Sequence, residues 1–402
     1  MSDRGRPDTP PAMQRGSARE VFLAFFALGC TSFGGPVAHL GYFRTEFVER
    51  RKWLDDAAYA DLLALCQFLP GPASSQVGMG LGKLRAGYPG AIAAFAGFTL
   101  PSVLLLLAFA YGATALTGPH AEGALHGLKI AALAVVAQAL WAMARSLTPD
   151  WPRRALALAT AALAFALPSA VTQVALIAAA AVIGILVPPR DEAAPAHLAL
   201  PRREGLAWLA LFAGLLVALP LLGLSGEPTI AVAEKFYRTG SLVFGGGHVV
   251  LPLLEAELVG PGLIQRDLFL AGYGAAQAVP GPLFSFAAYT GALLTSAPNG
   301  LWGAILALGM IYLPSFLLVF ATLDWWQSLR GNARLRNGLT LANAAVVGLL
   351  LATLWHPVAT SSIAGWPDIA WAVAALVLLF RKVPPPAVVL ASALLGACLA
   401  LV

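Results

Sequence analysis

The chain repeats itself over most of its length, and the second copy begins about 211 residues after the first. Three blocks carry the repeat: Phe33-Gly34-Gly35-Pro36 returns as Phe244-Gly245-Gly246-Gly247, Pro70-Gly71-Pro72 as Pro280-Gly281-Pro282, and Leu100-Pro101-Ser102 as Leu313-Pro314-Ser315. Hydrophobic chains made of two long repeats are typical of secondary transporters, which bind their substrate between the halves.

The composition places the chain in a membrane. Hydrophobic residues make up 59% of the sequence and charged residues 11%, whereas soluble domains carry roughly a quarter charged residues. Apolar stretches near the length of a bilayer span alternate with short loops that hold most of the charge. We therefore predict an all-α polytopic membrane protein, and interpret the net charge of +5 as cytoplasmic Lys and Arg rather than as a nucleic-acid surface.

The predicted organisation has five parts. They are a disordered cytoplasmic tail (1–18), a first repeat (19–187), a cytoplasmic linker (188–203), one unpaired connecting helix (204–228) and a second repeat (229–402). If each repeat crosses the membrane an even number of times, the single extra span inverts the second repeat.

Loop charges support this inversion. The loop 118–126 has no Lys or Arg, but its counterpart 324–337 has Arg330, Arg334 and Arg336; the next loop has Arg145, Arg153 and Arg154, and its counterpart 356–368 has none. Because Lys and Arg concentrate in cytoplasmic loops, we predict inverted-topology repeats, with the N-terminus cytoplasmic and the C-terminus external.

The first two segments of each repeat are predicted not to cross. Basic residues flank both segments of the first repeat, 20–42 and 57–82, on the same side, and Gly34-Gly35-Pro36 and Pro70-Gly71-Pro72 interrupt them. We expect about nine full spans plus four re-entrant hairpins, or up to about 13 segments if the hairpins cross.

The four breaks are the candidate anion site. A helix that starts after Pro36 or Pro72 presents free N–H groups at its positive end, which suits an anion; close helix packing through small residues is the alternative. The candidate substrate-binding residues are Gly34, Gly35, Pro36, His39, Arg44, Gln67, Pro70, Gly71, Pro72, Ser74, Ser75, Gly245, Gly246, Gly247, His248, Gln277, Pro280, Gly281, Pro282 and Ser285.

Several of these residues have a structural interpretation as well. His39 and His248 are ionisable at membrane depth, where they either act on substrate or complete hydrogen bonds. Arg44 and Glu46 could form an ion pair, and Glu257 repeats only the acid. Gln67 and Gln277 either bind an oxyanion or brace the hairpins.

The motifs resemble those of one known family. Thr31-Ser32-Phe33-Gly34-Gly35-Pro36-Val37-Ala38-His39, Phe43-Arg44-Thr45-Glu46-Phe47-Val48, Trp53-Leu54 and Gln67-Phe68-Leu69-Pro70-Gly71-Pro72, with the second-repeat blocks, are similar to the two-domain form of the chromate ion transporter (CHR) family. The resemblance implies an exporter of chromate, with sulfate as a look-alike, that works in the lipid bilayer of a bacterial inner (plasma) membrane. It implies no cofactor and leaves a homo-oligomer open.

Other classes remain as alternatives. A transporter of sulfate or another oxyanion would use the same motifs, and a passive anion channel would differ in showing no saturation. A membrane enzyme is disfavoured, because the sequence shows no nucleophile, metal-ligand or phosphate-loop signature.

Overall fold

The computed structural model describes residues 16–115, 118–187, 203–244, 247–323 and 332–399, and every regular element in these ranges is a helix. The predicted linker lies almost wholly outside the described residues, as do residues 1–15 of the predicted tail. Five helical segments are long and apolar enough to cross a membrane: Ala73–Ala113, Pro119–Leu147, Arg203–Gly223, Gly300–Thr322 and Ala333–Ser362. The prediction of an all-α polytopic membrane protein is confirmed.

The helices of the two repeats follow in the same order. The first repeat contains α1 (Ala18–Thr31), α2 (Gly35–Arg44), η1 (Thr45–Arg50), α3 (Asp56–Phe68), α4 (Ala73–Ala115), α5 (Pro119–Leu147), α6 (Trp151–Ala166) and α7 (Ala170–Leu186). The connecting helix is α8 (Arg203–Gly223). The second repeat contains α9 (Pro228–Leu242), η2 (Gly247–Val249), α10 (Val250–Leu254), η3 (Glu255–Val259), α11 (Arg266–Ala278), η4 (Leu283–Ser285), α12 (Phe286–Ala292), α13 (Gly300–Thr322), α15 (Ala333–Thr353), η5 (Leu354–Ala359), α16 (Thr360–Ser362), α17 (Trp366–Phe380) and α18 (Pro385–Leu399).

The helices break at the predicted positions. Helix α1 ends at Thr31 and α2 begins at Gly35, across Gly34 with a φ of 97°. Gly71 and Gly281, in the two Pro-Gly-Pro turns, have φ values of 123° and 96°. These left-handed conformations favour glycine because it has no Cβ. Helix α1 has 14 residues, or about 21 Å, which is shorter than the roughly 30 Å hydrocarbon core.

Helix α4 is two helices joined by a sharp bend. Ala86 and Gly87 leave the helical conformation, and Gly82 and Gly90 lie so close that a Cβ on either would overlap the other's carbonyl oxygen. The chain therefore folds back after Ala86. Gly291 of α12 and Gly303 of α13 make the same close contact in the second repeat.

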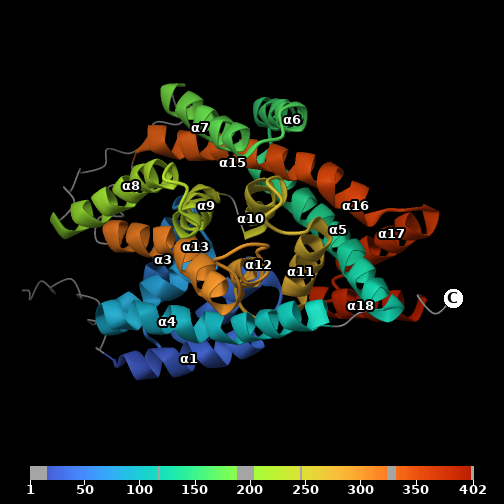
Figure 1. Cartoon of the computed structure of the whole chain (residues 1–402). Coiled ribbons are helices and arrows are strands. Elements are labelled where there is room, and N and C mark those ends of the chain that lie inside the picture. Colours follow the sequence, from blue (N-terminus) through green and yellow to red (C-terminus); the bar gives the residue numbers. More distant parts are fainter. Residues whose placement is uncertain (1–15, 116–117, 188–202, 245–246, 324–331, 400–402) are drawn as a thin grey trace, which may run out of the picture.

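The two repeats exchange their peripheral helices. Helix α5 packs against α17 and α18 of the second repeat, and α15 packs against α6 and α7 of the first, as Figure 1 shows. Glycines allow these crossings: a Cβ on Gly396 would overlap the carbonyl oxygen of Gly123, and a Cβ on Gly184 would lie 2.5 Å from that of Asn337. Close backbone approach through small residues is the usual basis of helix packing in membranes.

Candidate functional site

The four broken segments meet in the middle of the molecule, where each Pro-Gly-Pro turn bonds to the break of the other repeat. The N–H of Gly71 donates to the carbonyl of Val243 at 2.7 Å, and the N–H of Gly281 donates to the carbonyl of Ser32 at 2.9 Å. The two bonds join equivalent positions of the repeats, so they mark an approximate two-fold relation between the halves.

The contact between the two glycine-rich breaks explains a difference in sequence. Gly247 occupies the position of Pro36, and a Cβ built on Gly247 would lie 3.3 Å from Cγ of Pro36. The Pro36 ring thus fills the space that a second proline ring would need. The first break has a proline at this position and the second a glycine because the two breaks are in contact.

A cluster of hydroxyl groups surrounds these turns and also obeys the repeat. It consists of three pairs of equivalent residues: Ser75 with Ser285, Thr99 with Tyr312, and Ser102 with Ser315. The hydroxyls of Ser102 and Ser285 lie 2.6 Å apart, which joins α4 of the first repeat to η4 of the second. We call these six residues the hydroxyl cluster. Each of them is buried.

Part of this cluster has unused hydrogen-bonding capacity. The hydroxyl of Tyr312 lies near those of Ser75, Thr99 and Ser285, but the hydroxyls of Tyr312, Ser75 and Thr99 make no well-formed hydrogen bond with a described residue. The same is true of the Ser32 hydroxyl. A buried polar group left unpaired costs about 1–3 kcal/mol. Several of them between the two repeats, on α4, α13 and the end of α1, therefore point to a polar occupant.

Gln76 is a neighbour that sequence reasoning missed. Its amide donates to the carbonyl of Pro70 at 2.7 Å and lies 3.4 Å from the Ser315 hydroxyl. It thereby holds the first Pro-Gly-Pro turn against α13. The matched residue is Phe286, so this brace exists in one repeat only.

The two histidines lie near the cluster in different settings. His39 is buried, with Nδ1 3.5 Å from the Ser74 hydroxyl and its ring edge-on to Phe98. His248 has Nδ1 2.8 Å from the Tyr273 hydroxyl. His248 also borders a cavity of about 20 Å³, which is lined by Gly34, Gly35, Pro36, His248, Ala276, Gln277, Val279, Gly281 and Leu283.

This central cavity is too small for a tetrahedral oxyanion. One water already needs about 10–15 Å³ on this measure, so about 20 Å³ holds little more. Binding a larger anion there requires the broken segments to move apart.

The predicted pairing of Arg44 with Glu46 is wrong. Arg44 bonds to Glu49 and Asp56, at 2.5 and 2.7 Å, because it lies across the turn that leads into α3. Glu46 bonds instead to Arg50 and Arg51, both at 2.6 Å.

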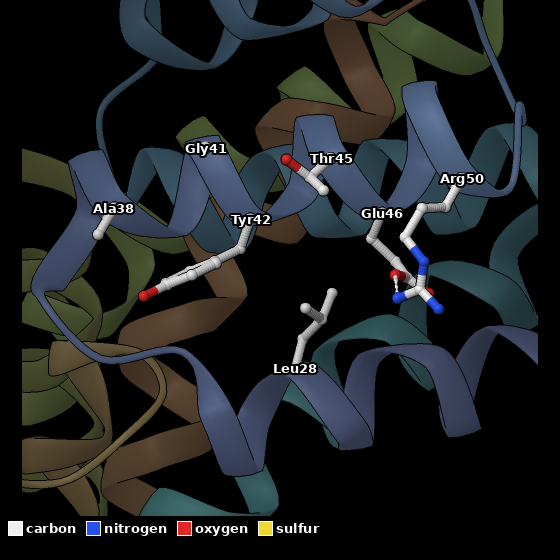
Figure 2. A pocket seen from close by; sticks show the side chains of 7 residues that line it. All are labelled: Leu28, Ala38, Gly41, Tyr42, Thr45, Glu46 and Arg50. Atoms are coloured by element: carbon white, nitrogen blue, oxygen red, sulfur yellow. Dashed lines mark hydrogen bonds and ion pairs between the residues drawn. The ribbon is translucent and has the colours of Figure 1, made fainter.

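The Glu46 side chain lines a groove of about 630 Å³ between α1 and α2. Figure 2 shows Leu28 and Tyr42 pointing into this groove and the Glu46–Arg50 pair at one end.

Glu257, the acid equivalent to Glu46, is paired from another helix. Its carboxylate lies 2.6 Å from Arg238 and 3.3 Å from Lys235, both on α9, and only 4% of its side chain is exposed. Glu46 has partners on its own segment that are largely exposed. The two equivalent glutamates thus form different contacts: Glu257 pairs with another helix, and Glu46 pairs with neighbours in its own segment.

Some predicted site residues lie away from the cluster or cannot be placed. Gln67 is exposed near the end of α3, whereas Gln277 lines the central cavity. Gly245 and Gly246 lie outside the described residues. Ser285 follows Pro282 in a short 3-10 turn, while Ser74 and Ser75 follow Pro72 in the first turn of the long helix α4.

Comparison with known proteins identifies the family. The profile of the chromate transporter family matches residues 19–185 and 230–397, one match for each repeat. The chain belongs to the chromate transporter family. No solved structure matches it.

Named relatives cover almost the whole chain. A probable chromate transport protein of Synechococcus elongatus is 26% identical over 94% of this chain and 95% of its own length. Chromate transport proteins of Cupriavidus metallidurans and Pseudomonas aeruginosa are each 27% identical, over 98% and 86% of this chain and 98% and 81% of their own lengths. These relatives are transport proteins rather than enzymes, as expected from the sequence.

Proposed function

We propose that the protein exports chromate from the cytoplasm of a bacterium, through the inner membrane, by alternating access between its inverted repeats. The observation that carries this proposal is the crossed pair of bonds from Gly71 and Gly281, which places both Pro-Gly-Pro turns at one point between the repeats. Family membership supports chromate as the substrate.

The hydroxyl cluster is the proposed binding site. The N–H groups of Ala73, Ser74 and Ser75 lie in the first turn of α4, where a helix has unpaired donors and a partial positive charge. The unpaired hydroxyls of Ser75, Thr99 and Tyr312 add hydrogen-bond donors beside them. The cluster and the lining of the central cavity contain no Asp or Glu, so no carboxylate repels the dianion.

The membrane potential can drive export without ATP. Moving one charge through 100 mV is worth about 2.3 kcal/mol, so a dianion leaving a negative interior gains roughly 4.6 kcal/mol. Protonation of His39 or His248 as the anion enters would offset part of its desolvation. Arg44 is less suited to this role, because two carboxylates already neutralise it.

Sulfate is the second candidate substrate. It shares the charge and tetrahedral shape of chromate, and the hydroxyl cluster has no feature that distinguishes the two. We therefore propose one oxyanion site that sulfate occupies in competition with chromate.

The test is chromate uptake into everted membrane vesicles, with and without a potential and with sulfate as competitor. We expect saturable, potential-dependent uptake. Removing one hydrogen bond to a charged ligand costs about 1.5–3 kcal/mol, so Ser75→Ala and Tyr312→Phe should each raise KM about tenfold or more.

Ser146→Ala is the matched control, because the Ser146 hydroxyl bonds to carbonyls of its own helix, at Ala142 and Met143, away from the cluster. Uptake that does not saturate would indicate a channel. Unchanged kinetics in both cluster variants would remove the site assignment, and absence of chromate uptake would remove the substrate.

A further inference from the structure

The helix before each Pro-Gly-Pro turn is packed differently in the two repeats. Helices α3 and α11 both have 13 residues, and they correspond residue by residue from Asp56 and Arg266 onward. Helix α11 packs along α5, whereas α3 packs chiefly on α4 of its own repeat. The difference involves helices that are otherwise equivalent.

One face of α11 forms the contact with α5. The carboxylate of Asp267 lies 3.1 Å from Nζ of Lys129. One turn further along, Leu270 is fully buried, and Gly274 lies so close to α5 that a Cβ would overlap the carbonyl oxygen of Leu128.

The corresponding face of α3 is uncovered. The residues equivalent to Asp267, Leu270 and Gly274 are Ala57, Ala60 and Ala64, and all three are exposed. Small residues four apart are the pattern by which helices approach closely in membranes. Helix α3 therefore carries a face suited to close helix packing that is exposed among the described residues.

The scaffold around both helices is the same. Gly396 and Gly184 fix the crossings of α18 on α5 and of α7 on α15, and both crossings are formed. The asymmetry is thus confined to the helices before the Pro-Gly-Pro turns. An inverted repeat exchanges its two arrangements when the transporter changes state, so α15 is the partner that fits α3.

We propose that the Lys129–Asp267 ion pair is the lock of the external gate, and that α3 docks on α15 when this lock opens. The structure then represents the cytoplasm-facing state, with α11 closed on α5 at the external side. In the other state, Ala64 lies near Leu339, which is the α15 residue equivalent to Leu128, and the Cβ of Ala64 keeps α3 further from α15 than Gly274 keeps α11 from α5.

The cytoplasmic gate, which is the proposed contact of α3 with α15, has no ion pair equivalent to the lock. The position of Asp267 is Ala57 in α3, and the position of Lys129 is Thr340 in α15. One gate is held by an ion pair plus packing and the other by packing alone, so the cytoplasm-facing state is favoured at rest. For an exporter this state exposes the site to the side from which the anion is collected.

The test is cross-linking of Ala64→Cys with Leu339→Cys, after Cys30, Cys66 and Cys398 have been replaced. Oxidation should produce slow cross-linking in the parent and faster cross-linking, by about threefold or more, once Asp267→Asn is added. The pair Lys129→Asp with Asp267→Lys should restore the slow rate. Transport should stop in the cross-linked protein and return after reduction.

Asp56→Asn is the matched control. It removes an ion pair with Arg44 in the first turn of α3, but that pair joins α3 to the preceding segment of its own repeat and takes no part in the contact of α11 with α5. It should leave the cross-linking rate unchanged. An equal rise in both variants, or no rise with Asp267→Asn, would overturn the lock.

A second measurement covers the case in which the cysteine pair alters folding. Ala60→Cys should react with an impermeant maleimide from the cytoplasmic side, and Asp267→Asn should slow that reaction. The opposite change, or labelling from outside only, contradicts the proposal. The idea rests on the proposed transport function, but neither readout needs an anion, so failure of the chromate assay leaves these results interpretable.

Discussion

The two repeats share one scaffold and differ in their hairpins. The crossings of α18 on α5 and of α7 on α15 depend on equivalent glycines, Gly396 and Gly184, and both are tightly packed. In the second repeat, Glu257 is buried and paired from α9, and α11 is packed on α5, whereas α3 of the first repeat is exposed at Ala60 and Ala64. The tightly packed scaffold is therefore symmetric, and the part that we propose to move is not.

This comparison separates residues that stabilise the scaffold from residues that take part in the proposed conformational change. A residue that has the same contacts in both repeats belongs to the support, and its loss should matter equally in either half. A residue whose partner differs between the repeats is expected to lie in the segments that we propose to move, or to form its contact in one conformational state only. Three pairs of substitutions test this division.

The largest difference is expected between the equivalent acids. Glu257→Gln removes the buried carboxylate that Lys235 and Arg238 share and leaves Arg238 paired with Glu234 alone, and breaking a buried ion pair costs about 3–5 kcal/mol. Glu46→Gln removes pairs with Arg50 and Arg51, whose side chains are 72% and 37% exposed, so it should cost at most about 1 kcal/mol.

Thermal unfolding in detergent measures both variants against the parent. Equal losses would mean that the buried setting of Glu257 has no energetic consequence and would contradict the difference between the hairpins.

A smaller and equal effect is expected at the two scaffold crossings. Gly396→Ala and Gly184→Ala each force a Cβ against a neighbouring backbone, at Gly123 and at Asn337, and overpacking of this kind costs about 1–3 kcal/mol. Gly214→Ala on α8 is the control, because no atom lies within 4 Å of its new Cβ. A loss confined to one crossing would show that the scaffold is less symmetric than its contacts suggest.

Sequence reasoning located the breaks but not the cluster. Gly34, Gly71 and Gly281 were identifiable because glycine and proline interrupt an otherwise apolar helix. Thr99 and Tyr312 were not, because a hydroxyl residue inside an apolar segment resembles ordinary packing until its neighbours are known. They occupy equivalent positions 213 residues apart, and alignment of polar residues within the apolar segments could have found them.

Ion pairs were the least predictable part of the site. Arg44 and Glu46 are close in sequence, but the turn into α3 brings Asp56 to Arg44 and leaves Glu46 to Arg50. A lysine near the start of an apolar helix usually reaches toward the membrane surface, yet Lys129 pairs with Asp267, more than 130 residues away. Contacts of this kind depend on how helices pack, which local pattern does not specify.

The smallest effect concerns the caps of the first helices of the repeats. The Ser17 hydroxyl accepts from the N–H of Glu20 at 3.1 Å, and the Glu227 carboxylate accepts from the N–H of Ile230 at 2.8 Å. That backbone hydrogen bond holds the pKa of Glu227 below its usual range. Ser17→Ala should cost about 1 kcal/mol at any pH, whereas the effect of Glu227→Gln should depend on pH.

The sign of that dependence follows from the lowered pKa of Glu227. A group that is more acidic in the folded protein contributes stability above its unfolded pKa of about 4.3, and this contribution is lost as the pH falls through the lower folded pKa. Glu227→Gln should therefore lower the unfolding midpoint at neutral pH and converge with the parent as the pH falls below about 4. If the gap persisted in acid, as it should for Ser17→Ala, the cap of α9 would act through its shape rather than its charge, and the two repeats would begin in the same way.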